Sequence, residues 1–91
     1  MSRVTAYHFW SPTCGPCKVI KPAVEDLKEE FSQVDWVTVN THQDPTGLTR
    51  KLGVTVVPTI AVVSATGAVE KHSGSDMMGY YRILRNATKA T

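Results

Sequence analysis

The chain has 91 residues, a length that suits one compact domain and is too short for a second. With 42% apolar and 20% charged residues, its composition is that of a globular protein and excludes a disordered or fibrous chain. Ten basic and eight acidic residues give a net charge of +2. The basic residues are scattered along the sequence and do not form the concentrated basic segment that is typical of nucleic-acid-binding proteins. We therefore expect a single domain, residues 1–91, that is monomeric and binds no nucleic acid.

Apolar runs and the first residues bear on the cellular location. The apolar stretch Ile60–Val63 ends at Ser64 and is too short to cross a membrane. The first ten residues contain no sustained apolar segment followed by a small-residue cleavage site, which a secretion signal requires. We expect a cytoplasmic protein without a membrane partner.

The first half of the chain predicts a strand, a helix and a second strand. Residues 3–10 are rich in β-branched and aromatic side chains, and Ser11-Pro12-Thr13 ends this pattern. A helix is predicted next, because apolar residues recur at helical spacing: Ile20, Val24, Leu27 and Phe31. Residues 34–39 then predict the second strand.

A short helix and a third strand follow. The helix carries Leu48 and ends at Gly53, a residue typical of helix C-termini. The β-branched stretch 54–63 contains Pro58, which cannot donate a hydrogen bond to a neighbouring strand. The third strand is therefore expected to begin at Pro58 or Thr59.

A hairpin and a last helix complete the pattern. A turn at residues 65–67 leads into a fourth strand at residues 68–73, and Ser75 or Asp76 caps the last helix. Its side chains are expected to face the core or to be half-buried: Met77, Met78, Tyr80, Tyr81 and Leu84. The order β-α-β-α-β-β-α predicts an α/β fold, a four-stranded mixed sheet with helices on both faces.

Two cysteines three residues apart, Cys14 and Cys17, are the candidate reactive groups. A thiolate attacks a disulfide whereas a thiol barely does, so redox chemistry needs a cysteine of lowered pKa. Cys14 stands at the start of the first predicted helix, where unpaired N–H groups and the helix dipole favour negative charge. Cys17 lies one turn further on, within reach for a disulfide. We predict that Cys14 is an exposed nucleophile and Cys17 a shielded resolving thiol.

The residues between the cysteines act through the backbone. Gly15 allows a sharp turn, and Pro16 suits the first turn of a helix, where a missing N–H costs little. The alternatives are half of a zinc site or a chance pair of buried cysteines. A structural zinc site needs four ligands, and neither a second CxxC nor a paired-histidine motif is formed by His8, His42 and His72. We therefore expect no metal.

The segment Trp10-Ser11-Pro12-Thr13-Cys14-Gly15-Pro16-Cys17-Lys18 resembles the active-site signature of the thioredoxin family. Further positions that resemble the family are Pro22 in the active-site helix, Asn40 with Pro45, Gly53, Val57-Pro58-Thr59 and Gly74. The resemblance spans Phe9 to about Gly74. It implies a minimal thioredoxin fold and a thiol-disulfide oxidoreductase that binds no cofactor and carries a redox-active disulfide between Cys14 and Cys17.

The resemblance also implies a groove for an extended substrate segment. Pro58 is expected to be cis, and Val57 is expected to offer its backbone groups to the substrate. The residues assigned to substrate binding are Trp10, Gly15, Pro16, Val57, Pro58 and Gly74.

The chain departs from the family pattern in several places. It begins too late for the first strand and helix of longer thioredoxins, and in this it resembles the glutaredoxin-sized form of the fold. Thr13 replaces the tryptophan that usually precedes the first cysteine. His8 and Thr38 replace a buried Asp and its neighbouring Lys. Loss of both charges together keeps the buried site balanced.

His8 is a candidate proton acceptor for Cys17, since neutral imidazole accepts a proton near physiological pH. The alternative is a neutral core histidine that is satisfied by a backbone group. Burial favours the neutral ring in both cases.

The function implied by the resemblance is reduction of disulfide-bearing protein substrates through a mixed disulfide. Thioredoxin reductase or a glutathione-linked system would reset the cysteine pair. Two alternatives stay open: a glutaredoxin-like reductase that uses glutathione, and a redox-inactive binding module built on the same fold.

Overall fold

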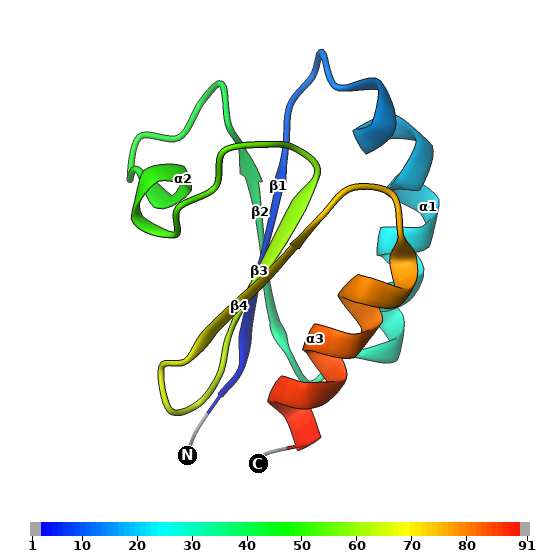
Figure 1. Cartoon of the computed structure of the whole chain (residues 1–91), viewed down its shortest axis with the longest axis vertical. Coiled ribbons are helices and arrows are strands. Elements are labelled where there is room, and N and C mark those ends of the chain that lie inside the picture. Colours follow the sequence, from blue (N-terminus) through cyan, green and yellow to red (C-terminus); the bar gives the residue numbers. More distant parts are fainter. Residues whose placement is uncertain (1–2, 90–91) are drawn as a thin grey trace.

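A computed structural model of the chain describes residues 3–89. Within these residues, four strands and three helices follow one another in the predicted order, β-α-β-α-β-β-α (Figure 1). The elements are β1 (Thr5–Trp10), α1 (Gly15–Glu30), β2 (Asp35–Asn40), α2 (Leu48–Lys51), β3 (Thr59–Val63), β4 (Val69–Ser73) and α3 (Met77–Lys89). The observed boundaries lie within a few residues of those that the apolar periodicity predicts.

The strands form one mixed sheet in the order β2-β1-β3-β4. β1 and β2 are parallel and are joined by α1, whereas β3 is antiparallel to both β1 and β4. Because parallel strands need a crossover connection, the β1-α1-β2 unit places the start of α1 beyond the carboxyl end of β1. His8 lies in the middle of β1, in register with Thr38 of β2 and Ile60 of β3.

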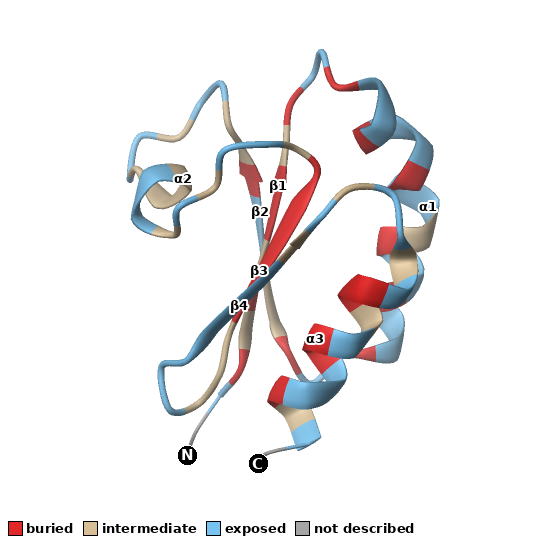
Figure 2. Ribbon diagram, in the orientation of Figure 1, coloured by how far each residue is buried: buried red, intermediate tan, exposed pale blue. Residues whose placement is uncertain are grey.

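The larger part of the core lies between the sheet and the two long helices, α1 and α3, which cover the same face of the sheet (Figures 1 and 2). Side chains alternate along β1, so that Ala6 points into this core while Phe9 points to the opposite face. A smaller cluster around Phe9, Val39 and Ala61 lies on that other face. Leu48 of α2 packs against it, so helices lie on both faces, as predicted.

Two expectations for α3 were wrong. Met78 is 71% exposed, whereas Tyr80 is completely buried. The buried stripe of α3 runs through Tyr80, Ile83, Leu84 and Ala87, and Met78 therefore lies outside it. Asp76 fulfils the predicted cap, because its carboxylate accepts the Met78 N–H at 3.1 Å.

No helix within the described residues 3–89 has both the length and the apolar character needed to span a lipid bilayer.

Candidate active site

The cysteine pair occupies the N-terminus of α1. Cys14 is the N-cap, with extended backbone angles, and Pro16 stands in the first turn, where its lack of an N–H costs little. Cys14 and Cys17 are joined by a disulfide, and their Cα atoms lie 5.3 Å apart. The Cys17 N–H donates a hydrogen bond to the Cys14 sulfur at 3.1 Å. In the reduced protein the same N–H and the helix dipole would stabilise a thiolate on Cys14.

The two cysteines differ less in exposure than expected. Cys14 is 9% exposed and Cys17 is 5% exposed, so Cys14 is not an open surface residue in the disulfide form. The bond itself contributes to this burial, because each sulfur covers part of the other. Gly15 and Pro16, which lie between the two cysteines, are exposed at the surface next to the disulfide.

The segments around Pro58 and Gly74 lie side by side at the open end of the β3-β4 hairpin, where Thr59 pairs with Ser73. The Val57-Pro58 peptide bond is cis, as the family resemblance implies. The Gly74 N–H donates to the Pro58 carbonyl at 3.0 Å. Gly74 has a φ of 103°, a conformation that side chains other than glycine rarely adopt. Val57 is partly buried and packs against the cluster around Phe9.

Tyr80 of α3 links these two segments, and sequence reasoning missed this role. Its hydroxyl is 3.2 Å from the Pro58 carbonyl oxygen and 2.5 Å from that of Gly74, so one O–H group serves two acceptors. Burial, reinforced by the negative charge of Asp76, raises the pKa of Tyr80 to about 12 and keeps the phenol protonated. Only the helical stripe of α3 could have indicated that Tyr80 points inward.

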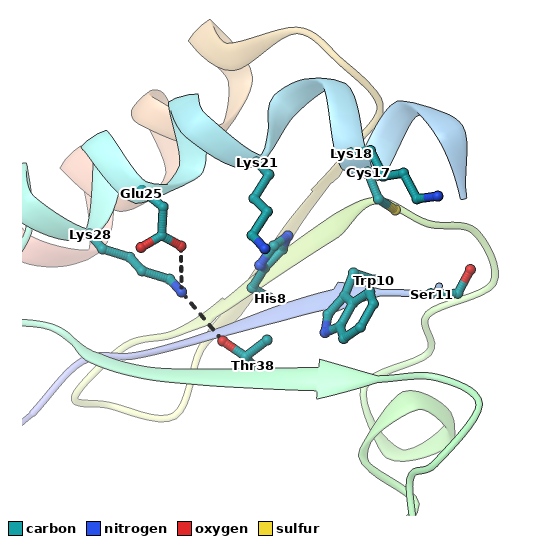
Figure 3. A pocket seen from close by; sticks show the side chains of 9 residues that line it. All are labelled: His8, Trp10, Ser11, Cys17, Lys18, Lys21, Glu25, Lys28 and Thr38. Atoms are coloured by element: carbon teal, nitrogen blue, oxygen red, sulfur yellow. Dashed lines mark hydrogen bonds and ion pairs between the residues drawn. The ribbon is translucent and has the colours of Figure 1, made fainter. Parts of the chain in front are cut away.

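A cavity of about 270 Å³ lies behind Cys17, between α1 and the sheet (Figure 3). His8 and Trp10 from β1 and Thr38 from β2 line its sheet side. The remaining lining residues are Ser11, Cys17, Lys18, Lys21, Glu25 and Lys28. Sequence reasoning did not single out Lys21, Glu25 and Lys28, although their spacing of four, four and three residues after Cys17 places them on one helix face.

His8 is the least satisfied group of this cavity. Its side chain is buried, and neither ring nitrogen has a hydrogen-bond partner among the described residues 3–89. Burial, aided by the positive charge of Lys28 and opposed by Glu25, lowers the pKa of His8 to about 4. The ring is therefore neutral at physiological pH, and one of its nitrogens is free to accept a proton.

Lys28 lies close to His8 in the same cavity but has partners of its own. Its ammonium group is 3.2 Å from the Glu25 carboxylate and 3.4 Å from the Thr38 hydroxyl. Thr38 thus stands next to His8 in the sheet, where the family pattern has a lysine beside an aspartate. A lysine from α1 supplies the nearby positive charge instead.

The described part of the chain contains no group of three or more His, Cys, Asp or Glu side chains placed to hold a metal ion.

A mixed four-stranded sheet, a disulfide-bonded CxxC pair at the start of α1 and a cis-proline before β3 define a protein of the thioredoxin-like class. The family model for thioredoxin matches residues 2–81 of the chain. The chain therefore belongs to the thioredoxin family.

Individual relatives agree with this assignment. A thioredoxin from Pyropia yezoensis is 34% identical over 68 residues, which cover 74% of this chain and 63% of that protein. The thioredoxin of Bacillus subtilis (strain 168) is 36% identical over 69 residues, which cover 72% of this chain and 64% of that protein. The matching region thus spans less than two thirds of each relative. The X-ray structure of Fasciola hepatica thioredoxin superposes with a TM-score of 0.84 at 27% identity, covering 94% of this chain and 82% of that one.

Proposed function

We propose that the protein is a thioredoxin-type thiol-disulfide oxidoreductase that uses the dithiol of Cys14-Gly15-Pro16-Cys17. The observation that carries the proposal is the position of the pair, with Cys14 as N-cap of α1 and its sulfur accepting the Cys17 N–H at 3.1 Å. A helix N-terminus lowers the pKa of a cysteine by stabilising its thiolate. Nucleophile and resolving thiol are thereby distinguished by their places on one helix.

The catalytic cycle consists of two thiol-disulfide exchanges. The Cys14 thiolate attacks one sulfur of a substrate disulfide, which forms a mixed disulfide and releases the other substrate sulfur as a thiolate. The Cys17 sulfur, once deprotonated, attacks Cys14 and expels the second substrate thiolate. Two electrons pass to the substrate, and the Cys14–Cys17 disulfide remains. A separate reductant, thioredoxin reductase or a glutathione-linked system, resets the pair.

The proposed substrates are disulfide-bearing proteins that bind as extended segments beside the cysteines. Gly15 and Pro16 form the exposed rim of the pair, and the hydrogen bond between Gly74 and Pro58 holds the two loop segments of the groove together. Val57 would supply backbone hydrogen bonds, and Trp10 would border the site. We propose that the domain, residues 1–91, acts as a monomer in the cytoplasm.

His8 is the proposed proton acceptor for Cys17. It lines the same cavity as Cys17, its ring is neutral, and both ring nitrogens lack partners within residues 3–89. With a pKa of about 4 it is a weak base. The imidazolium would therefore exist only briefly, stabilised by the Cys17 thiolate beside it. His8→Ala should slow release of the reduced substrate more than the initial attack by Cys14, whereas the exposed His42→Ala should change neither step. Equal effects of His8→Ala on both steps would contradict this role.

The main test of the function is a Cys17→Ser variant, which cannot complete the second exchange. Incubated with a disulfide-bearing protein, it should accumulate a mixed disulfide through Cys14 that reductant releases. Cys14→Ser is the matched control and should capture nothing. If neither variant differs from the other, or if Cys14→Ser retains the function of the wild-type protein, the chain is a binding module and not a reductase.

The reductant is identified by a separate assay. The oxidised protein is offered NADPH with thioredoxin reductase, or glutathione with glutathione reductase, and reduction of the Cys14–Cys17 bond is followed. Faster reduction by thioredoxin reductase supports the thioredoxin assignment, and faster reduction by glutathione favours the glutaredoxin-like alternative.

A further inference from the structure

The cavity behind Cys17 carries an excess of positive charge. Three lysines and one glutamate line it: Lys18, Lys21, Lys28 and Glu25. Glu25 is paired with Lys28 at 3.2 Å, whereas among residues 3–89 no ion pair involves Lys18 or Lys21. Both of these lysines are exposed, so the cavity is in reach of solvent molecules. Its uncompensated charge favours an anion.

On the sheet side of the cavity, His8 offers a hydrogen-bond donor that has no partner among residues 3–89. His8 is only 6% exposed, and a neutral imidazole always carries one N–H. A buried polar group without a partner destabilises the protein, and a suitably placed acceptor would remove that penalty. Figure 3 shows the Lys21 side chain pointing from α1 toward the His8 ring. An acceptor between the two would receive hydrogen bonds from both.

The remaining lining residues are suited to the apolar part of a bound molecule. Trp10, Cys17 and the lysines line the cavity. An indole ring, a sulfur atom and the aliphatic stems of lysines are apolar groups that can contact the apolar part of a ligand. A volume of about 270 Å³ exceeds by several times the roughly 30 Å³ that one water molecule occupies in the liquid. A small organic molecule therefore fits, and the flat face of an indole favours a flat partner.

We propose that this cavity binds a small aromatic carboxylate, with its carboxylate group between His8 and Lys21 and its ring against Trp10. The proposal concerns binding alone and holds whether or not His8 acts in the resolving step.

Binding should be coupled to protonation of His8. The charged groups that face the ring are Lys21, Glu25 and Lys28 from α1, while β2 contributes the neutral Thr38. A bound carboxylate adds a negative charge, which stabilises the imidazolium and raises the pKa of His8 from its value of about 4. By linkage, the ligand binds more tightly as the pH falls below neutrality, as long as it stays ionised.

The test compares benzoate with benzamide, which has the same ring but no charge. Binding to the disulfide form of the intact chain is measured by titration calorimetry, and the His8 ring is followed by NMR. Benzoate should bind about tenfold more tightly than benzamide and shift the His8 ring signals, since a hydrogen bond to a charged group is stronger than one to a neutral group. Lys21→Gln should weaken benzoate binding about five- to tenfold, whereas Lys51→Gln on α2 should leave it unchanged.

Each result decides the proposal. Lys21 and Lys51 are both exposed, so neither variant threatens the fold. Equal affinity for benzoate and benzamide, unchanged His8 signals, or equal binding by the two lysine variants would overturn the assignment. Because no turnover is measured and the disulfide stays closed, these outcomes are separate from success or failure of the proposed reductase function.

Discussion

His8 makes the stability of this domain depend on pH in a narrow and testable window. Its pKa is about 4 in the folded chain, against 6.5 for an unperturbed histidine. As the pH falls, the unfolded chain therefore binds the proton first, and the native state is penalised. The stabilisation is fully present above about pH 6.5 and is lost as the pH falls toward 4. At 1.36 kcal/mol per pKa unit, the loss is roughly 3 kcal/mol.

The perturbation that isolates this effect is His8→Phe, which keeps a buried ring and removes the titratable nitrogens. The free energy of unfolding of the disulfide form is measured by urea titration at a series of pH values, with tryptophan fluorescence as the signal. Other ionisable groups are common to both proteins and cancel in the difference. Asp35 and Asp44, whose pKa values are lowered by Arg3 and by Thr49 respectively, lose their contribution only below their ordinary value of 3.8.

The wild-type chain should lose roughly 3 kcal/mol more than His8→Phe between about pH 6.5 and 4. Buffers free of carboxylates are needed, so that the proposed ligand site stays empty. Parallel stability curves for the two proteins across this window would refute the reasoning, because they would show that the folded and unfolded chains protonate His8 alike.

Three further predictions concern the surroundings of the site. Gly79→Ala should destabilise the protein by about 1–2 kcal/mol although alanine favours helices, because a Cβ at this position would overlap the His72 ring. In a His72→Ala background the same change should instead stabilise the protein. If urea titrations show the same sign of the effect in both backgrounds, the assigned clash is contradicted. Tyr80→Phe should lower the free energy of unfolding by about 1–2 kcal/mol and slow mixed-disulfide formation, because the hydroxyl that donates to the Pro58 and Gly74 carbonyls is lost. Unchanged stability and an unchanged rate would show that this hydroxyl is not needed to hold the two segments together. Lys28→Met should raise the pKa of His8, because the positive charge of Lys28 lowers it, and Glu25→Gln should lower it further, because the negative charge of Glu25 raises it. NMR titration of the His8 ring measures both shifts. If the two variants shift the pKa in the same direction, these charges do not act on His8 in this way.

Much of the fold followed from local patterns in the sequence. The helical spacing of Ile20, Val24, Leu27 and Phe31 predicted α1, and these residues are buried. Pro58 predicted the start of β3, because a residue without an N–H cannot pair within the ladder. Cys14 as N-cap and Cys17 one turn later required only the geometry of one helix turn. Each of these features depends on residues that are neighbours in the chain.

The electrostatic and packing details of the site depended on contacts between distant segments. Tyr80 is buried because α3 lies against the sheet, and its hydroxyl then reaches carbonyl groups that lie 22 and 6 residues away in the chain. In the sequence, Gly79 indicates only a lowered helix propensity within α3. In the structure, its lack of a side chain leaves space for the His72 ring of β4. Such contacts cannot be inferred from the pattern of neighbouring residues in the sequence.

His8 shows where the two kinds of information meet. The sequence by itself placed a histidine on the first strand at the position of the family's buried acid, and it determined the CxxC pair and the order of the elements. Only the tertiary structure decided that both ring nitrogens lack partners within the described residues 3–89 and that the ring is neutral. It alone also placed Lys21, Glu25 and Lys28 around the same cavity. The physical reason is that desolvation and charge interactions depend on distances in space, which the packing of α1 on the sheet sets.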